Sequence, residues 1–376
     1  MPLKRFVLSA CLASSLPAPA ALAAAPQGLA PLNLAHTFAQ VRDKDSTRTL
    51  FVVALRDKDV SAVDLSALSG SSSPDAFDVV NRFTPAALDA LARDPALRRS
   101  YPLVRLLGVG PRGVAHIAAG TNYPAHGEET GVDGAFLFPK IAPSGGPRST
   151  VVAAPGALLD YEVEVCVRFD RELRSLDDFD AARKGFFVCG DYSDRATLMR
   201  RINLKNILSG DGFPDAKSGP DRFPTGPLLV VPRDWQAFMR ELTIETWVNG
   251  ERRQQARARD MLKDLRAIVT ETLDEAAART WSYGAGRIPI VARPAIGTES
   301  AVLTGTGEGV VFKEPGPEVV APLMQTADRG KQLSIIDDYI GTLAAKRIYL
   351  QPGNRVRYTG TYLGAIESRV VAPPRH

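Results

Sequence analysis

Three acidic side chains lie where two predicted strands could bring them together. Glu162 and Glu164 fall in a segment, 161–169, with the alternating pattern of a strand, and Asp191 ends the apolar strand expected over 185–191. Residues i and i+2 of a strand project from one face, so the two glutamates should lie side by side. Such carboxylates repel each other unless water, a proton or a cation separates them. A hard divalent cation would satisfy them; a solvent-facing polar edge is the alternative.

The rest of the sequence limits which metal could bind. The chain has 3 cysteines and 4 histidines, and it contains no C-x-x-C motif. A metal site would therefore rely on carboxylate oxygens. Such ligands favour Mg²⁺ or Mn²⁺, with Ca²⁺ as a third candidate.

A second group of residues could activate water. His126 and Glu129 follow a predicted strand and a glycine-rich turn. If a helical turn forms there, their i, i+3 spacing places both on one face. A carboxylate beside an imidazole orients the ring and raises its basicity, as in a general base. The alternative is a surface loop with an incidental histidine.

The surrounding pattern predicts an α+β fold. From about residue 103, short strands alternate with Gly/Pro turns, and the clearest amphipathic helix covers 261–280. Before that, the pattern predicts a strand over 50–55, a short strand over 64–68, and a helix that begins at Pro85 with Thr84 as its N-cap.

Composition excludes some classes of partner. Of 376 residues, 45% are hydrophobic, and the formal net charge is only +4. That mild, scattered charge argues against nucleic acid binding. After the N-terminus, no apolar run approaches the roughly 18 residues of a membrane span.

The N-terminus reads as a signal peptide over 1–25. Lys4 and Arg5 precede an apolar segment over 6–16, and Ala21-Leu22-Ala23 offers a cleavage site. A first core helix is the alternative, but two prolines, at positions 17 and 19, disfavour it. We therefore expect a periplasmic or secreted mature protein.

Two cysteines, Cys166 and Cys189, lie on the strands of the acidic cluster. If Glu164 lay opposite Asp191 in an antiparallel pair, Cys166 would fall opposite Cys189, within reach of a disulfide in an oxidising compartment. Two buried free thiols are the outcome we favour.

These motifs occur together, in order, over about 260 residues, and they resemble the fumarylacetoacetate hydrolase family. The residues that carry the resemblance are Asn122-Tyr123-x-x-His126-x-x-Glu129, Phe136-Leu137-Phe138-Pro139-Lys140, Asp160-Tyr161-Glu162-Val163-Glu164, Gly185 through Arg195, Lys217-Ser218, Val248-Asn249-Gly250-Glu251-x-x-Gln254, Val302-Leu303-Thr304-Gly305-Thr306 and Leu350-Gln351-Pro352-Gly353. The chain departs from the family pattern after Lys217, where Gly219 and Pro220 replace Phe and Asp.

The resemblance implies a mixed β-roll, usually in a homodimer. It assigns Mg²⁺ or Mn²⁺ to Glu162, Glu164 and Asp191, and catalytic roles to His126, Glu129 and Lys217. Tyr123, Gln254 and Thr306 would bind substrate. It also implies an N-terminal region over 26–105 and a catalytic domain over 106–376, with an insertion at about 313–348.

The leading hypothesis from this resemblance is a metal-dependent hydrolase that cleaves a carbon–carbon bond in a 2,4-dioxo acid. A decarboxylase, isomerase or hydratase of 2-oxo acids could use the same metal-stabilised enolate. A non-catalytic oxo-acid binder is a third hypothesis. It would bind its ligand in a metal-dependent way without turnover.

Overall fold

The computed structural model describes residues 28–276 and 278–374, so the expected signal peptide lies outside the described residues. A mixed sheet of ten strands forms the centre of the molecule. In spatial order its strands are β4 (Arg98–Pro102), β3 (Asp59–Asp64), β2 (Ser46–Leu55), β1 (Ala35–Asp43), β12 (Leu229–Pro232), β10 (Lys184–Gly190), β9 (Val163–Phe169), β17 (Val302–Leu303), β5 (Ala115–Gly120) and β6 (Phe136–Ile141).

A second sheet has five strands. Its order is β14 (Glu251–Arg257), β13 (Thr243–Val248), β18 (Arg355–Gly360), β19 (Gly364–Val371) and β7 (Arg148–Val152). Two small pairs complete the strands: β8 (Leu159–Asp160) with β11 (Ser193–Asp194), and β15 (Thr280–Tyr283) with β16 (Gly286–Pro289). Most neighbours are antiparallel, whereas β17–β5 and β19–β7 are parallel. The predicted α+β class with large mixed sheets is confirmed.

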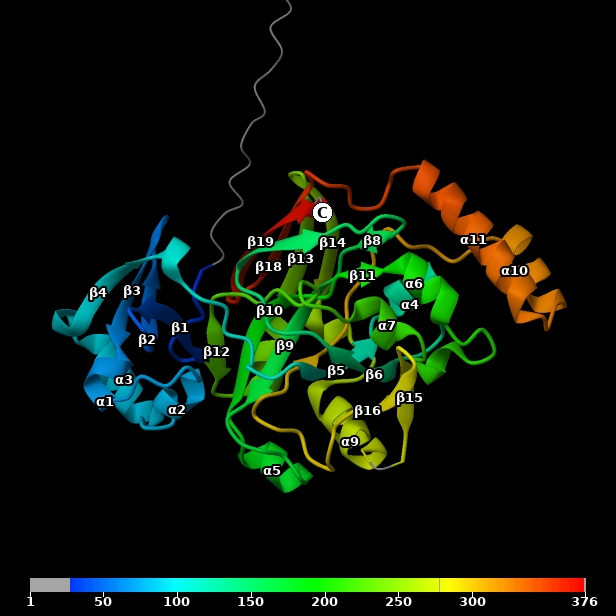
Figure 1. Cartoon of the computed structure of the whole chain (residues 1–376). Coiled ribbons are helices and arrows are strands. Elements are labelled where there is room, and N and C mark those ends of the chain that lie inside the picture. Colours follow the sequence, from blue (N-terminus) through cyan, green and yellow to red (C-terminus); the bar gives the residue numbers. More distant parts are fainter. Residues whose placement is uncertain (1–27, 277, 375–376) are drawn as a thin grey trace, which may run out of the picture.

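Helices border these sheets on several sides (Figure 1). They are α1 (Leu65–Ser69), α2 (Ala76–Val80), α3 (Pro85–Arg93), α4 (Pro124–Thr130), α5 (Leu176–Ala181), α6 (Arg195–Arg201), α7 (Phe213–Lys217), α8 (Trp235–Glu241), α9 (Leu265–Glu275), α10 (Pro317–Gln325) and α11 (Arg329–Ala345). No described helix is long and apolar enough to cross a membrane.

The N-terminal strands extend the central sheet. Strand β1 pairs with β12, and Ala35 lies opposite Pro232, so β1–β4 continue the sheet that carries the acidic cluster. Thr84 caps α3 as expected, because its hydroxyl accepts the Ala87 backbone N–H at 3.2 Å. The short strand expected over 64–68 is wrong: Asp64 ends β3 and then caps helix α1. The domain boundaries remain predictions.

The expected insertion holds two helices, α10 and α11, which lie at the opposite end of the molecule from β1–β4 (Figure 1). Their buried apolar residues, Val319, Leu323, Ile336, Ile340 and Leu343, join a small core of their own together with Met199 of α6. This core is separate from the main one, so α10 and α11 are attached mainly through α6.

A disulfide joins Cys166 to Cys189, with Cα atoms 5.8 Å apart. The preference for free thiols was therefore wrong. The strand register from which the disulfide was considered was also wrong, because Glu164, not Cys166, lies opposite Cys189. The bond runs diagonally between β9 and β10, the two strands that lead to Glu164 and Asp191.

Candidate active site

Three carboxylates meet where β9 and β10 come together. Glu164 lies within β9, Glu162 just before it, and Asp191 just after β10. The expectation that Glu162 belongs to the strand is wrong, because β9 begins at Val163. Even so, one ligand oxygen from each acid lies within 4.8 Å of the others, and all three residues are buried. The backbone N–H of Asp191 donates to the Glu162 carbonyl at 2.9 Å, which holds the two segments together.

Buried cations surround this acidic cluster. Lys217 donates to Glu162 at 2.6 Å and to Asp191 at 3.0 Å. Lys140 donates to the other oxygen of Asp191 at 2.6 Å. Arg195 donates to Glu162 at 2.6 Å and to Asp160 at 2.9 Å.

Lys140 and Arg195 belong to the motifs that resemble the family, but no role at the site was predicted for them from the sequence. The signal for Lys140 was present, because a lysine within an apolar strand must find a partner when the strand is buried. The structure provides that partner in Asp191.

The pKa values of the two glutamates shift in opposite directions. Burial raises the pKa of Glu162, but Lys217, Arg195 and His126 outweigh it, and the pKa falls to about 2. Burial raises the pKa of Glu164 well above its usual range, and the charges of Asp191 and Glu162 raise it further. The neighbouring cations therefore leave negative charge at Glu164 incompletely balanced.

The donor set fits a hard divalent cation. It offers three carboxylates in a buried pocket, and Mg²⁺, Mn²⁺ and Ca²⁺ all prefer oxygen ligands. A cation placed among them would supply the charge that Glu164 lacks. Glu162, Glu164 and Asp191 are the residues that would hold it.

A glycine brings a backbone donor to the same cluster. The Gly305 N–H donates to Glu164 at 2.6 Å. Gly305 adopts a φ of 94°, which side-chain-bearing residues rarely adopt. A Cβ there would also lie 2.8 Å from the Cβ of Asn122. Glycine thus lets the loop after β17 approach the carboxylate.

The predicted His–Glu pair forms on helix α4. Pro124 begins the helix, and Gly131 ends it in a left-handed conformation. His126 Nδ1 lies 3.2 Å from Glu129 Oε2, and both side chains are largely buried. Burial lowers the pKa of His126 to about 4, and Arg195 and Lys217 contribute, although Glu162 opposes the shift. The imidazole is therefore neutral near pH 7.

Glu129 also fastens the helix to the following loop. It accepts the Gly309 N–H at 3.0 and 3.1 Å and forms an ion pair with Lys313. The Glu314 N–H donates to its backbone carbonyl at 3.2 Å. Lys313, at the start of the insertion, was not expected at this site.

The residues expected to bind substrate lie in different places. Thr306 is buried and lines the cavity beside the acidic cluster. The side-chain amide of Gln254 is hydrogen-bonded to other protein groups: it accepts the Val163 N–H at 3.3 Å and donates to the Thr306 hydroxyl at 2.9 Å. Tyr123 is buried but lines a different recess, which it shares with Arg257. Their roles in substrate binding remain predictions.

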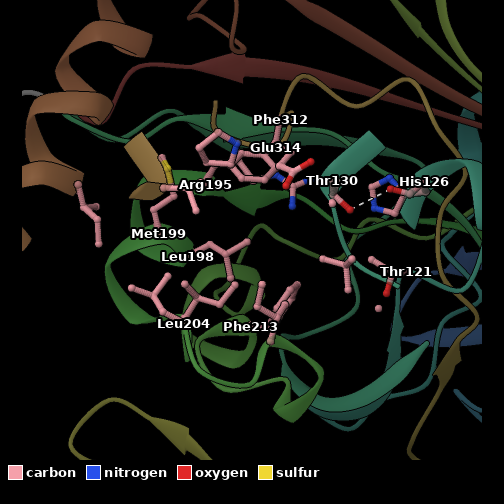
Figure 2. A pocket seen from close by; sticks show the side chains of 18 of the residues that line it. Thr121, His126, Thr130, Arg195, Leu198, Met199, Leu204, Phe213, Phe312 and Glu314 are labelled. Atoms are coloured by element: carbon pink, nitrogen blue, oxygen red, sulfur yellow. Dashed lines mark hydrogen bonds between the residues drawn. The ribbon is translucent and has the colours of Figure 1, made fainter. Parts of the chain in front are cut away.

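A cavity of about 210 Å³ opens from this site (Figure 2). His126, Glu162, Arg195, Lys217 and Thr306 line its polar end. Beyond them, apolar side chains from α6, α7 and the insertion form most of its wall. The arrangement can hold a small acid beside a cation and place a neutral imidazole next to it.

The chain is similar in sequence to known proteins. The family model described as "Fumarylacetoacetate (FAA) hydrolase C-terminal" matches residues 115–371, more than half of the chain. The chain is 26% identical over 237 residues to the 4-hydroxyphenylacetate degradation bifunctional isomerase/decarboxylase of Escherichia coli, covering 61% of this chain and 47% of that protein. A second Escherichia coli relative, the homoprotocatechuate catabolism bifunctional isomerase/decarboxylase, is covered over 38% of its length. The chain therefore spans less than half the length of these relatives.

Solved structures share the fold. A fumarylacetoacetate hydrolase from Exiguobacterium antarcticum superimposes with a TM-score of 0.56 at 19% identity, over 90% of this chain and 100% of that one. The maleylpyruvate hydrolase from Sphingobium sp. SYK-6, solved with manganese(II) and pyruvate, gives a TM-score of 0.53 at 19% identity and the same coverage. The family model, the ordered motifs and the shared fold agree: the chain belongs to the fumarylacetoacetate hydrolase family.

Proposed function

We propose that the protein is a metal-dependent hydrolase of 2,4-dioxo acids. The observation that carries this proposal is the His126–Glu129 pair, because its imidazole lines the same cavity as Glu162 of the acidic cluster. A site that only bound an oxo acid would not need a neutral imidazole backed by a carboxylate.

In the proposed reaction, water adds to the C4 carbonyl and the bond between C3 and C4 breaks. The acyl half leaves as a carboxylic acid, and C3 takes a proton to give pyruvate. A bound divalent ion would stabilise the negative charge that develops on the 2-oxo acid half as the bond breaks.

His126, supported by Glu129, would accept the proton from the attacking water. Glu129 accepts from Nδ1 of His126, which leaves Nε2 as the basic nitrogen. Lys217 would stabilise developing negative charge while it orients Glu162 and Asp191. Burial of all these groups strengthens their electrostatic effect.

An isomerase/decarboxylase is the second candidate, because the Escherichia coli relatives carry that name. Such a reaction would use the same acidic cluster without activating water. The two candidates differ in their products: hydrolysis releases pyruvate and an acid, whereas decarboxylation releases CO₂.

The test is a screen of 2,4-dioxo acids with Mg²⁺ or Mn²⁺, in which pyruvate and CO₂ are both measured. We expect metal-dependent pyruvate release that Glu129→Gln lowers. A matched Glu128→Gln variant, which changes the neighbouring exposed glutamate, should keep full activity. CO₂ release that is insensitive to Glu129→Gln would instead support the decarboxylase.

A further inference from the structure

The cavity beside the acidic cluster has two chemically different ends. Figure 2 shows Leu198, Met199, Leu204 and Phe213 gathered on one side, away from His126. The insertion supplies the facing wall, which includes Val319 and Leu323. A substrate whose acid group reached the polar end would place its remaining atoms against this apolar surface.

Charge also distinguishes the two ends. Among the described residues that line the cavity, Arg195 and Lys217 are the only lysines or arginines, and both are already paired with carboxylates at the polar end. The lining also includes an acid, Glu314, which lies near Arg195 and Thr130 (Figure 2). A second carboxylate at the far end of the substrate would therefore lie against apolar residues, with no lysine or arginine of the described lining to pair with it.

The segment that leads into the insertion is anchored to the site itself. Asp160, which accepts from Arg195, also accepts the backbone N–H groups of Val311 at 3.0 Å and Phe312 at 3.1 Å. Further along, Arg200 of α6 pairs with Asp337 of α11 at 2.8 Å. The wall built by α10 and α11 is thus held in a fixed place beside the catalytic residues.

The cavity mouth is apolar as well. Val320 and Met324 line it one turn apart on α10, and these residues are 38% and 65% exposed. Exposing two such side chains at the same opening costs hydration free energy that contact with an apolar ligand would recover.

We infer that this site takes oxo acids with a long apolar tail, an alkyl or aryl group on the acyl side, and that α10 and α11 select that tail. The inference rests on the proposed function, because the site must bind the oxo-acid head. It adds that a second carboxylate at the far end of the substrate is disfavoured.

The experiment measures binding of non-cleavable 2-oxo acids to the Mn²⁺-loaded protein by calorimetry. The series runs from pyruvate through 2-oxohexanoate to 2-oxodecanoate, with 2-oxoadipate as the dicarboxylate matched to 2-oxohexanoate. We expect affinity to rise by up to roughly fourfold for each added methylene until the cavity is filled. 2-Oxoadipate should bind more weakly than 2-oxohexanoate.

Two variants separate this inference from a folding defect. Leu323→Glu should lower the ratio of affinities for 2-oxodecanoate and pyruvate by at least about tenfold, because it places a carboxylate in the apolar wall. Met324→Arg changes an exposed residue and should raise the affinity for a long-chain 2-oxo dicarboxylate about two- to fivefold. The matched control Ile348→Arg, also exposed but outside the cavity lining, should change neither.

The outcomes are distinguishable. If pyruvate binds but chain length has no effect, or if 2-oxoadipate binds as tightly as 2-oxohexanoate, the tail inference is wrong while the proposed function stands. If affinity does not change with chain length and Leu323→Glu instead dissociates an oligomer, the apolar surface of α10 and α11 is a subunit contact. If no 2-oxo acid binds, the proposed function fails, and this inference fails with it.

Discussion

At the scale of single residues, the site is organised by unequal carboxylates. Glu162 has its charge stabilised by Lys217 and Arg195, whereas Glu164 is buried beside two other acids and accepts the Gly305 backbone N–H. Glu164 therefore holds a proton to higher pH than an ordinary glutamate, and a metal must displace that proton.

This difference predicts a pH dependence of metal binding. Because the pKa of Glu164 is raised, the protonated form persists as pH rises, and metal affinity is reduced at every pH below that pKa. In that range, Mn²⁺ affinity should rise by up to about tenfold per pH unit, with about one proton released per ion.

Calorimetry in buffers of different ionisation enthalpy measures the released proton directly. Glu129→Gln serves as a control, because it alters a carboxylate outside the acidic cluster and should keep the same pH slope. Affinity that stayed constant from acidic to neutral pH would show that Glu164 is already ionised.

At the scale of elements, the sequence predicted those helices and strands that are determined by residues close together in the chain. Pro124 and Gly131 mark the ends of α4, so the i, i+3 pairing of His126 and Glu129 could be anticipated. The sequence pattern likewise placed Glu164 within one strand, β9, and Asp191 at the end of another, β10. These features depend on residues within a few positions of one another.

Features that depend on tertiary packing could not be predicted from the sequence. The register of β9 against β10 differs by two residues from the assumed one, since nothing in either strand fixes the pairing. The ion pair between Lys140 and Asp191 joins residues 51 positions apart. The sequence of the insertion did not predict that α10 and α11 would line the cavity, because an apolar helix face can equally well pack into a closed core.

The disulfide yields a prediction at this scale. Cys166 and Cys189 are 23 residues apart, and closing a loop of that size stabilises a protein by about 3 kcal/mol, chiefly by restricting the unfolded chain. The double variant Cys166→Ala/Cys189→Ala should lose about that much unfolding free energy in urea titration. Reductant should destabilise the parent protein similarly and leave the variant unchanged. Equal stability of the two proteins without reductant would argue against the bond.

At the scale of the whole molecule, we propose that the chain is exported. The sequence pattern of residues 1–25 supports this proposal, as does a buried disulfide, which persists in oxidising compartments. Material isolated from its native host should begin near Ala24 or Pro26 by intact mass. An uncut N-terminus on that material would rule the proposal out.

We propose that the acidic cluster holds the metal and that the His126–Glu129 pair activates water. Removing one of three anionic ligands weakens the hold on a hard cation directly. Removing the carboxylate behind His126 leaves those ligands in place but weakens a general base, whose contribution is typically about 10²–10⁴-fold.

The most direct test is calorimetric Mn²⁺ titration of Asp191→Asn and Glu129→Gln beside their turnover on the best 2,4-dioxo acid from the screen. Asp191→Asn should lose metal affinity, and excess metal should restore part of its activity. Glu129→Gln should bind Mn²⁺ almost as the parent does while its kcat falls sharply. If Glu129→Gln lost the metal and Asp191→Asn kept it, Glu129 would be a ligand and the proposed roles of the two groups would be wrong.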